Sequence, residues 1–411
     1  MDDLSESFHK VSLENYFIQT RKATVSIVDN LEPEDMVLQS ADFVSPIKWH
    51  LAHTTWFFEE FIIKPYTKNF KPYNESFSYV FNSYYNTVGE FNPKQKRGLL
   101  NRPLLKDVFK YREYVNEKII DLLLQKKESN FRFLIQLGIN HEQQHQELIL
   151  MDIKNIFYNN PLMPKFINKK KSETNYKAAV SFRLKKQEFF VLGYQGDNFC
   201  FDNELPISNN LVEPFQISPL ITNKQWYDFI RNDGYKDPKF WLSDGWDFIK
   251  TNNIDKPMYW IDNNYQFSLN GIVKINENNP VSHISFYEAD AFSRFMKKRL
   301  PTEIETEFFL KKTKKSGNFF ENKNFHEIPE DHLESHGNLW VWTQSNYLPY
   351  KNYKPYKNKL TEYNSKFMCN QFVLKGGSHS TPKDHVRSSY RNFYYPKDRW
   401  HFCGLRLATS I

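Results

Sequence analysis

The sequence lacks several features that would place it in a familiar class. It has three cysteines among 411 residues, at positions 200, 369 and 403. An odd, widely spaced set of this kind is neither a disulfide framework nor a zinc ribbon. No run approaches the roughly 18 apolar residues of a membrane span, and residues 1–10 lack the apolar core of a signal peptide. These absences predict a soluble, cytoplasmic protein with no membrane partner.

A sustained basic stripe is also missing. The formal net charge of +7 comes from scattered lysines and from short runs at 169–171 and 311–315. Solvated loops account for such runs, so we expect no nucleic-acid partner. Aromatic residues make up 17% of the chain, which is typical of a globular protein, and the length suffices for two domains.

The central motif is Asn140–Leu150, which reads NHEQQHQELIL inside an apolar pattern from 131 to 157. His141 and His145 are four residues apart, so both imidazoles face one side of a helix, as two metal ligands do. An isolated pair at this spacing is more often a solvated helix face. The apolar surroundings and the amide-bearing residues between the histidines favour a metal site. Glu147 lies about 200° around the helix from His145 and is not expected to join them.

A third ligand is expected from a second aromatic-rich segment, Trp49-His50-Leu51-Ala52-His53. The spacing alone leaves both of its histidines open as ligands. Ser45 is the predicted N-cap of this helix and Pro46 its first residue. The sequence therefore predicts a three-histidine site that keeps open coordination positions.

Apolar periodicity predicts an N-terminal four-helix bundle over residues 1–160, with the metal site between its second and fourth helices. The four helices are expected at 12–30, 46–63, 105–125 and 130–159. Residues 70–103 carry several prolines and glycines, so we expect a long loop without a helix there, of the kind that is usually functional.

The second half has a different character. Residues 161–180 lose periodicity and are the predicted linker. Residues 181–411 are expected to form an irregular, loop-rich α+β domain. Its clearest elements are strands at 189–192 and 214–217 and helices at 223–231 and 285–297.

Several phrases in this half are specific: PVSHIS at 280–285, RLPTE at 299–303, NLWVWT at 338–343, and GGS at 376–378. They resemble the formylglycine-generating-enzyme-like sulfatase-modifying domain over about 189–408. That resemblance implies an α+β, C-type-lectin-like fold in which most of these residues are scaffold. The parent family uses a cysteine pair, and Cys369 and Cys403 fall in no such pairing. Formylglycine generation is thus disfavoured.

The whole chain, with a DinB-like bundle before this domain, resembles the ergothioneine-biosynthetic sulfoxide synthases. The resemblance implies that His53, His141 and His145 bind iron(II), and it leaves His50 as a packing residue or an outer contact. It also implies an O2-dependent reaction. Cysteine sulfur is joined to the imidazole C2 of Nα-trimethylhistidine (hercynine), and the sulfur is oxidised to a sulfoxide.

The same resemblance extends to substrate contacts. Asn392 and Phe393 are expected to face hercynine, and Gln144, on the metal-facing side of its helix, is a further candidate. A small zwitterion such as cysteine needs a cation for its carboxylate, and Arg97 and Arg102 are the candidates.

Two features of the family pattern bear on the sulfur donor and the acid. Members that use γ-glutamylcysteine often have Trp-Asp after the asparagine, where this chain has Phe393-Tyr394. The phrase FNSYY at 81–85 resembles the branch that accepts free cysteine. It implies that Tyr84 or Tyr85 supplies a proton, or a hydrogen atom, as oxygen is reduced.

Three other functions remain open. An ovothiol-type enzyme would join cysteine to unmethylated histidine at another ring carbon. Those proteins commonly carry a methyltransferase domain, for which no glycine-rich strand-turn-helix remains here. A related enzyme would use a selenium donor. A non-catalytic small-molecule binder would hold no iron.

Overall fold

The computed structural model describes residues 12–168, 180–330 and 333–411. The chain divides into two compact units, Met1–Asp152 and Ile153–Ile411, which we describe separately. Most of the predicted linker, 161–180, lies outside the described residues, and the predicted domain limits stay a prediction. None of the described helices combines the length and apolar character needed to cross a bilayer.

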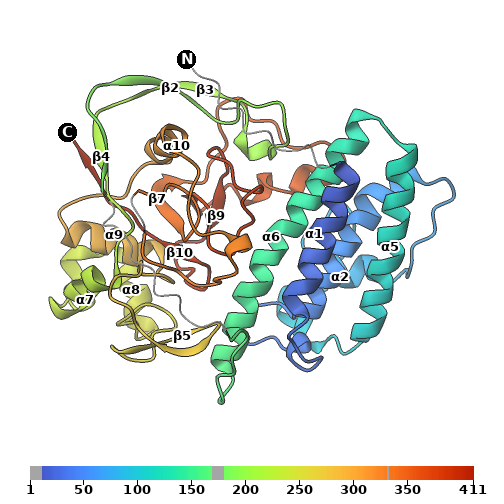
Figure 1. Ribbon diagram of the computed structural model, residues 1–411, viewed down its shortest axis with the longest axis horizontal. Coiled ribbons are helices and arrows are strands. Elements are labelled where there is room, and N and C mark those ends of the chain that lie inside the picture. Colours follow the sequence, from blue (N-terminus) through green and yellow to red (C-terminus); the bar gives the residue numbers. More distant parts are fainter. Residues whose placement is uncertain (1–11, 169–179, 331–332) are drawn as a thin grey trace. The chain divides into compact units, whose positions relative to one another are not determined.

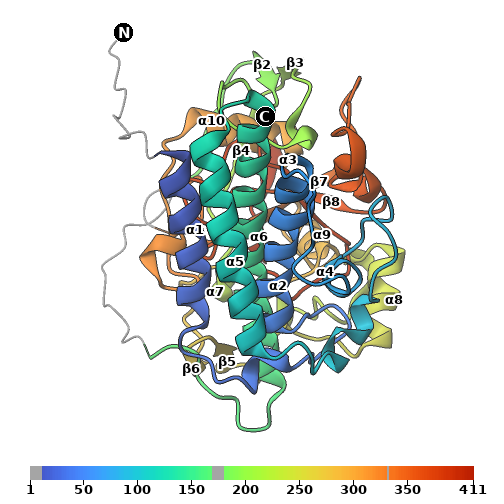
Figure 2. The ribbon, with the colours of Figure 1, turned by 90° about the vertical axis from the view of Figure 1, so that its right-hand side faces the viewer.

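Four long helices dominate the first unit. They are α1 (Leu13–Val28), α2 (Ile47–Phe58), α5 (Leu105–Gln125) and α6 (Ser129–Asn159), the last of which runs past the end of the unit. Figure 1 shows them side by side, and Figure 2 shows α1, α5 and α2 next to one another with α6 behind them. The predicted helical bundle is confirmed.

Shorter elements join these helices. The chain leaves α1 through a 3-10 turn, η1 (Asp35–Val37), and leaves α2 through a π-helical turn, η2 (Glu59–Ile63), followed by α3 (Lys64–Tyr66). The segment 70–103 holds α4 (Phe77–Phe81) and a 3-10 helix, η3 (Lys94–Leu99). The prediction that it contains no helix was wrong. Aromatic packing stabilises α4, because Phe77 meets Phe81 and Tyr111 at ring distances of 4.9 and 5.0 Å.

The predicted start of α2 also needs correction. Ser12 caps α1 as its type and position suggest, by accepting the backbone N–H of Asn15. Ser45 caps nothing. Pro46 is the N-cap of α2, without a side-chain cap. The Ser45 hydroxyl instead accepts a hydrogen bond from Arg97, at 3.0 Å. The hydroxyl of Ser45 is therefore bound to Arg97, a residue distant in the sequence, instead of capping α2.

Two features bring α6 against its neighbours. Gly138, in the middle of α6, faces the buried ring of Phe58, and a Cβ there would lie 2.5 Å from that ring. One turn later Glu142, 0% exposed, accepts from Arg21 of α1 at 2.7 Å and from Arg112 of α5 at 2.8 Å. Burial raises the pKa of Glu142, but the two guanidinium groups outweigh it and lower the pKa to about 2. This carboxylate joins three helices directly beside His141.

The described strands of the second unit form a three-stranded sheet, a four-stranded sheet and two two-stranded antiparallel pairs. The order β1-β4-β11 forms one sheet and β10-β7-β8-β9 the other, while β2 pairs with β3 and β5 with β6. In the four-stranded sheet only the β10–β7 pair is parallel. The strands are β1 (Phe182–Leu184), β2 (Glu188–Leu192), β3 (Ser208–Val212), β4 (Phe215–Ile217), β5 (Tyr265–Ser268), β6 (Gly271–Lys274), β7 (Trp340–Asn346), β8 (Phe372–Lys375), β9 (Asn392–Tyr394), β10 (Cys403–Gly404) and β11 (Ala408–Ser410).

Within the described part of this unit, the α-helices that follow α6 are α7 (Asn223–Arg231), α8 (Ser243–Thr251), α9 (Phe286–Phe295) and α10 (Glu303–Lys312). The prediction named α7 and α9 but missed α8 and α10. Residues of the specific phrases PVSHIS and RLPTE have structural roles in this unit. Ser285 and Thr302 form capping boxes at the starts of α9 and α10, and Glu303 pairs with buried Arg391 at 2.7 Å.

Candidate metal centre

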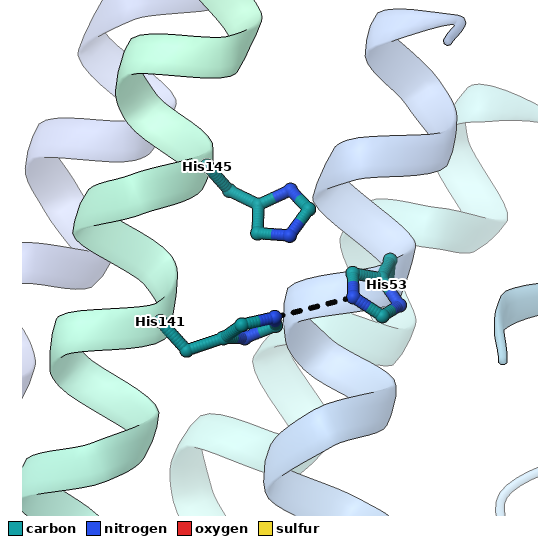
Figure 3. Close-up of side chains that lie close together, drawn as sticks. All are labelled: His53, His141 and His145. Carbon is teal, nitrogen blue, oxygen red and sulfur yellow. Dashed lines mark hydrogen bonds between the residues drawn. The ribbon is translucent and has the colours of Figure 1, made fainter. Parts of the chain in front are cut away.

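Three histidines converge inside the helical unit. His53 projects from α2, and His141 and His145 project from successive turns of α6 toward it (Figure 3). Their ligand-capable atoms all lie within 4.8 Å of one another, and the Nε2 atoms of His53 and His141 are 3.2 Å apart. That separation suits two nitrogen ligands that each lie about 2.1 Å from a shared ion. Among the described residues, only these three form such a group, and Glu147 does not belong to it.

The last residue of α4 orients His53 through its backbone carbonyl. Its Nδ1 lies 2.6 Å from the carbonyl oxygen of Phe81, which can only accept. Nδ1 therefore carries the proton, and the lone pair is on Nε2, the atom that faces His141. Trp49 stacks on the ring of His53, with centroids 4.5 Å apart and planes 9° from parallel. The ring is thus fixed in both position and tautomer.

The cluster is buried and electrically neutral. His53, His141 and His145 are 1%, 5% and 8% exposed. Burial lowers the pKa of His141 to about 3 and lowers the pKa values of His53 and His145 well below 6.5, with the neighbouring histidines adding to the effect for the latter two. Neutral imidazoles are the ligand form for a transition metal. The residues therefore fit a transition-metal ion, and three nitrogen ligands would leave coordination positions open for other molecules.

His50 lies outside this cluster but touches it. Its Nδ1 is 2.8 Å from His145 Nδ1, and its Nε2 is 2.9 Å from Asp152 Oδ2. Sequence reasoning left His50 as a packing residue or an outer contact and missed Asp152 altogether. Asp152 could have been found from its spacing, because it follows His145 by seven residues and therefore lies on the same face of the helix.

Tyr84 and Tyr85 lie together near Trp56, whose ring packs against that of His53. Their hydroxyls are 3.3 Å apart and their rings stack at 4.5 Å. Tyr85 is buried, and its ring lies 5.9 Å from that of Trp56, which in turn lies 5.6 Å from His53. Asn82 accepts the backbone N–H of Tyr85, one residue after the carbonyl that orients His53. The segment Phe81–Asn82 therefore positions both the imidazole of His53 and the backbone of Tyr85.

The two candidate arginines differ in their surroundings. Arg97 is 5% exposed and lies over the ring of Trp49, 3.4 Å from its centroid. Burial lowers its pKa to about 9, so it stays charged at neutral pH. Arg102 is exposed and donates to the backbone carbonyl of Asn101. Gln144 is half-buried on α6 between His141 and His145.

Both parts of the chain match known protein families. Residues 184–335 and 331–411 match the sulfatase-modifying factor enzyme 1-like domain, and together they cover more than half of the chain. The chain belongs to this family. Residues 16–149 match the DinB superfamily. The predicted fold class, a DinB-like helical bundle followed by a formylglycine-generating-enzyme-like α+β domain, is confirmed.

Relatives extend along nearly the full chain. A protein named hercynine oxygenase from Mycolicibacterium thermoresistibile is 24% identical over 443 residues, covering 98% of this chain and 96% of that protein. A protein of the same name from Mycobacterium tuberculosis is 26% identical and covers 72% of this chain and 76% of its own. These relatives confirm the resemblance to the ergothioneine-biosynthetic sulfoxide synthases. They also confirm the prediction that the chain is an oxidoreductase. Among solved structures, PvdO from Pseudomonas aeruginosa matches with a TM-score of 0.40 and 16% identity over 56% of this chain and 94% of its own.

Two of the predicted hercynine contacts, Asn392 and Phe393, lie in the sulfatase-modifying factor enzyme 1-like domain. Asn392 begins β9, and its side chain accepts the backbone N–H of Phe393 at 3.0 Å. Phe393 stacks on Tyr347, with centroids 4.1 Å apart and planes 11° from parallel. Their contact with a substrate stays a prediction. The described cysteines of this domain, Cys200, Cys369 and Cys403, are free thiols.

Proposed function

We propose that this protein is an iron(II)- and O2-dependent sulfoxide synthase that joins the sulfur of cysteine to the imidazole C2 of hercynine. The observation that carries the proposal is the buried cluster of three neutral histidines, which leaves ligand positions open. The relatives named hercynine oxygenase support the choice of substrate. Free cysteine as the donor rests on the resemblance to the cysteine-using branch.

The reaction balances without a further reductant. Forming the C–S bond removes one hydrogen from carbon and one from sulfur, and oxidising the sulfur to a sulfoxide removes two more electrons. O2 accepts all four electrons: one oxygen atom ends in the sulfoxide and the other in water. Hercynine, cysteine and O2 are therefore sufficient substrates.

His53, His141 and His145 would hold the iron, which when bound supplies the one-electron chemistry that O2 reduction requires. The aromatic rings that pack on the histidines would keep water away from the cluster. Phe57 stacks on His141 at 4.2 Å, and Trp49 stacks on His53 at 4.5 Å. Exclusion of water suppresses side reactions of partly reduced oxygen.

The phenols of Tyr84 and Tyr85 would supply a proton from Oη as oxygen is reduced. Their paired hydroxyls support this role, because a proton lost from one can be replaced from the other. Without that proton, both oxygen atoms would be added to the cysteine sulfur and the product would be cysteine sulfinate.

Polar side chains would hold the substrates. Gln144, which lies between His141 and His145 on α6, would make a polar contact with hercynine, and the resemblance implies Asn392 and Phe393 as further contacts. For the cysteine carboxylate, Arg102 has an exposed guanidinium, whereas Arg97 is already engaged with Ser45 and Trp49. We therefore favour Arg102 of the two.

Product analysis tests this proposal. Protein loaded with iron under anaerobic conditions is mixed with hercynine or histidine, each paired with cysteine or γ-glutamylcysteine, and exposed to O2. Mass spectrometry should find the sulfoxide conjugate of hercynine and cysteine as the main product. A main product built from histidine would favour the ovothiol-type enzyme, and the absence of any conjugate would refute a synthase.

A further inference from the structure

Three buried side chains connect the helix that carries two ligands to the start of α2. Asp152 of α6 lies 2.9 Å from His50 of α2, and His50 lies 2.8 Å from His145 of α6. The three residues are 2%, 3% and 8% exposed. We call Asp152, His50 and His145 the relay.

The hydrogen bonds of the relay have one consistent direction. Asp152 Oδ2 also accepts the backbone N–H of Ser45, at 2.9 Å, so this oxygen is an acceptor. His50 therefore donates its Nε2–H to Asp152. A neutral imidazole has one donor and one acceptor nitrogen, which leaves the Nδ1 of His50 as an acceptor.

That acceptor determines the state of His145. The Nδ1 atoms of the two rings are 2.8 Å apart, so one must donate to the other. Because His50 accepts there, His145 carries its proton on Nδ1 and its lone pair on Nε2. We infer that Asp152 and His50 are positioning residues that hold His145 in the tautomer whose Nε2 can bind the metal. The inference rests on the proposed metal centre.

His53 offers a comparison within the same cluster. The carbonyl oxygen of Phe81 fixes its tautomer through Nδ1, as the relay does for His145 through a second imidazole and a carboxylate. Partners of this kind, one step removed from the ion, typically change metal affinity by 10–100-fold when removed. Unlike a backbone carbonyl, the relay can be altered by substitution.

Metal affinity gives the first test. Binding of Fe(II) and of Co(II) is measured by competition with a chelator under anaerobic conditions. His50→Phe and Asp152→Leu should each weaken binding about 10–100-fold, and the double variant should bind no more weakly than the weaker single one, because either change breaks the same relay. His50→Gln offers an amide oxygen to His145 and should recover most of the affinity. His326→Gln, a half-buried histidine of the second unit, is the matched control and should bind as the wild type does.

The outcomes separate the relay from the proposed function. If the wild type binds neither metal, the metal centre fails. If the wild type binds but His50→Phe and Asp152→Leu bind equally well, the relay fails and the centre stands. Additive losses in the double variant would also overturn the relay. Thermal unfolding of the metal-free variants checks that each one folds.

The tautomer itself gives a second test that needs no metal. Long-range proton–nitrogen correlation spectra of the histidine rings distinguish a protonated Nδ1 from a protonated Nε2. In the metal-free wild type, His145 should be protonated at Nδ1 and His50 at Nε2, with the signals assigned from His145→Gln and His50→Gln. A His145 ring protonated at Nε2 would refute the inference.

Discussion

Glu142 should be the acidic residue whose loss most destabilises the helical unit. It is fully buried, one residue after His141, and it is the shared partner of Arg21 and Arg112. Its pKa falls from 4.5 to about 2, and a shift of that size corresponds to about 3 kcal/mol at neutral pH. Removing one partner of a buried ion pair typically costs about 3–5 kcal/mol. Glu142→Gln should therefore lower the free energy of unfolding by about 3–5 kcal/mol.

Urea unfolding followed by far-ultraviolet circular dichroism measures this loss. Glu113→Gln, the same substitution at an exposed position of α5, is the control and should change stability by less than about 0.5 kcal/mol. The folded pKa of Glu142 lies below its ordinary value, so its contribution is complete above pH 4.5 and is lost as the pH falls toward 2. The wild type and Glu142→Gln should converge over that range. A difference below about 1 kcal/mol at pH 7, or one that does not shrink in acid, would refute the reasoning.

Four further outcomes are expected. His141→Ala should lose iron, because two protein ligands hold a divalent ion weakly; a full iron content by elemental analysis would contradict its role. Tyr84→Phe or Tyr85→Phe should keep iron and shift the product from the sulfoxide conjugate toward cysteine sulfinate, and an unaltered product ratio in both and in the double variant would move the acid elsewhere. Asn392→Ala should raise KM for hercynine with unchanged iron content, and an unchanged KM would exclude a hercynine contact. Gly138→Ala should lower the melting temperature despite a gain of about 1 kcal/mol in helix propensity, because the α2 ring leaves no room for a Cβ; a raised melting temperature would show that the ring can move.

The long helices could be predicted because their apolar faces repeat over several turns. The prediction of α5 matched the observed limits, Leu105–Gln125, and that of α6 began one residue late. The elements that were missed are short. Local sequence gave no warning of α4, whose stability comes from Phe77 packing on Tyr111, more than thirty positions away. Ser45 was misread for a related reason, since its true partner, Arg97, is distant in the chain.

The candidate site likewise has parts that could be predicted from the sequence and parts that could not. The spacing of His141 and His145 placed both on one helix face, and the resemblance selected His53, which the structure groups with them. The surroundings of the cluster could not be found in this way. The Phe81 carbonyl is a backbone group that no side-chain pattern marks, and the Arg21–Glu142–Arg112 cluster joins three separate helices. Such contacts depend on packing rather than on local spacing.

Isotope labelling of the oxygen atoms is the most direct test of the proposed reaction. Iron-loaded wild type is given hercynine, cysteine and isotopically heavy O2 in ordinary water, and the product is weighed by mass spectrometry, with His141→Ala as the control. We expect a sulfoxide conjugate that carries one heavy oxygen atom from the wild type and no conjugate from the control. A conjugate formed without O2, a product whose oxygen comes from water, or an equal yield from His141→Ala would contradict the proposal.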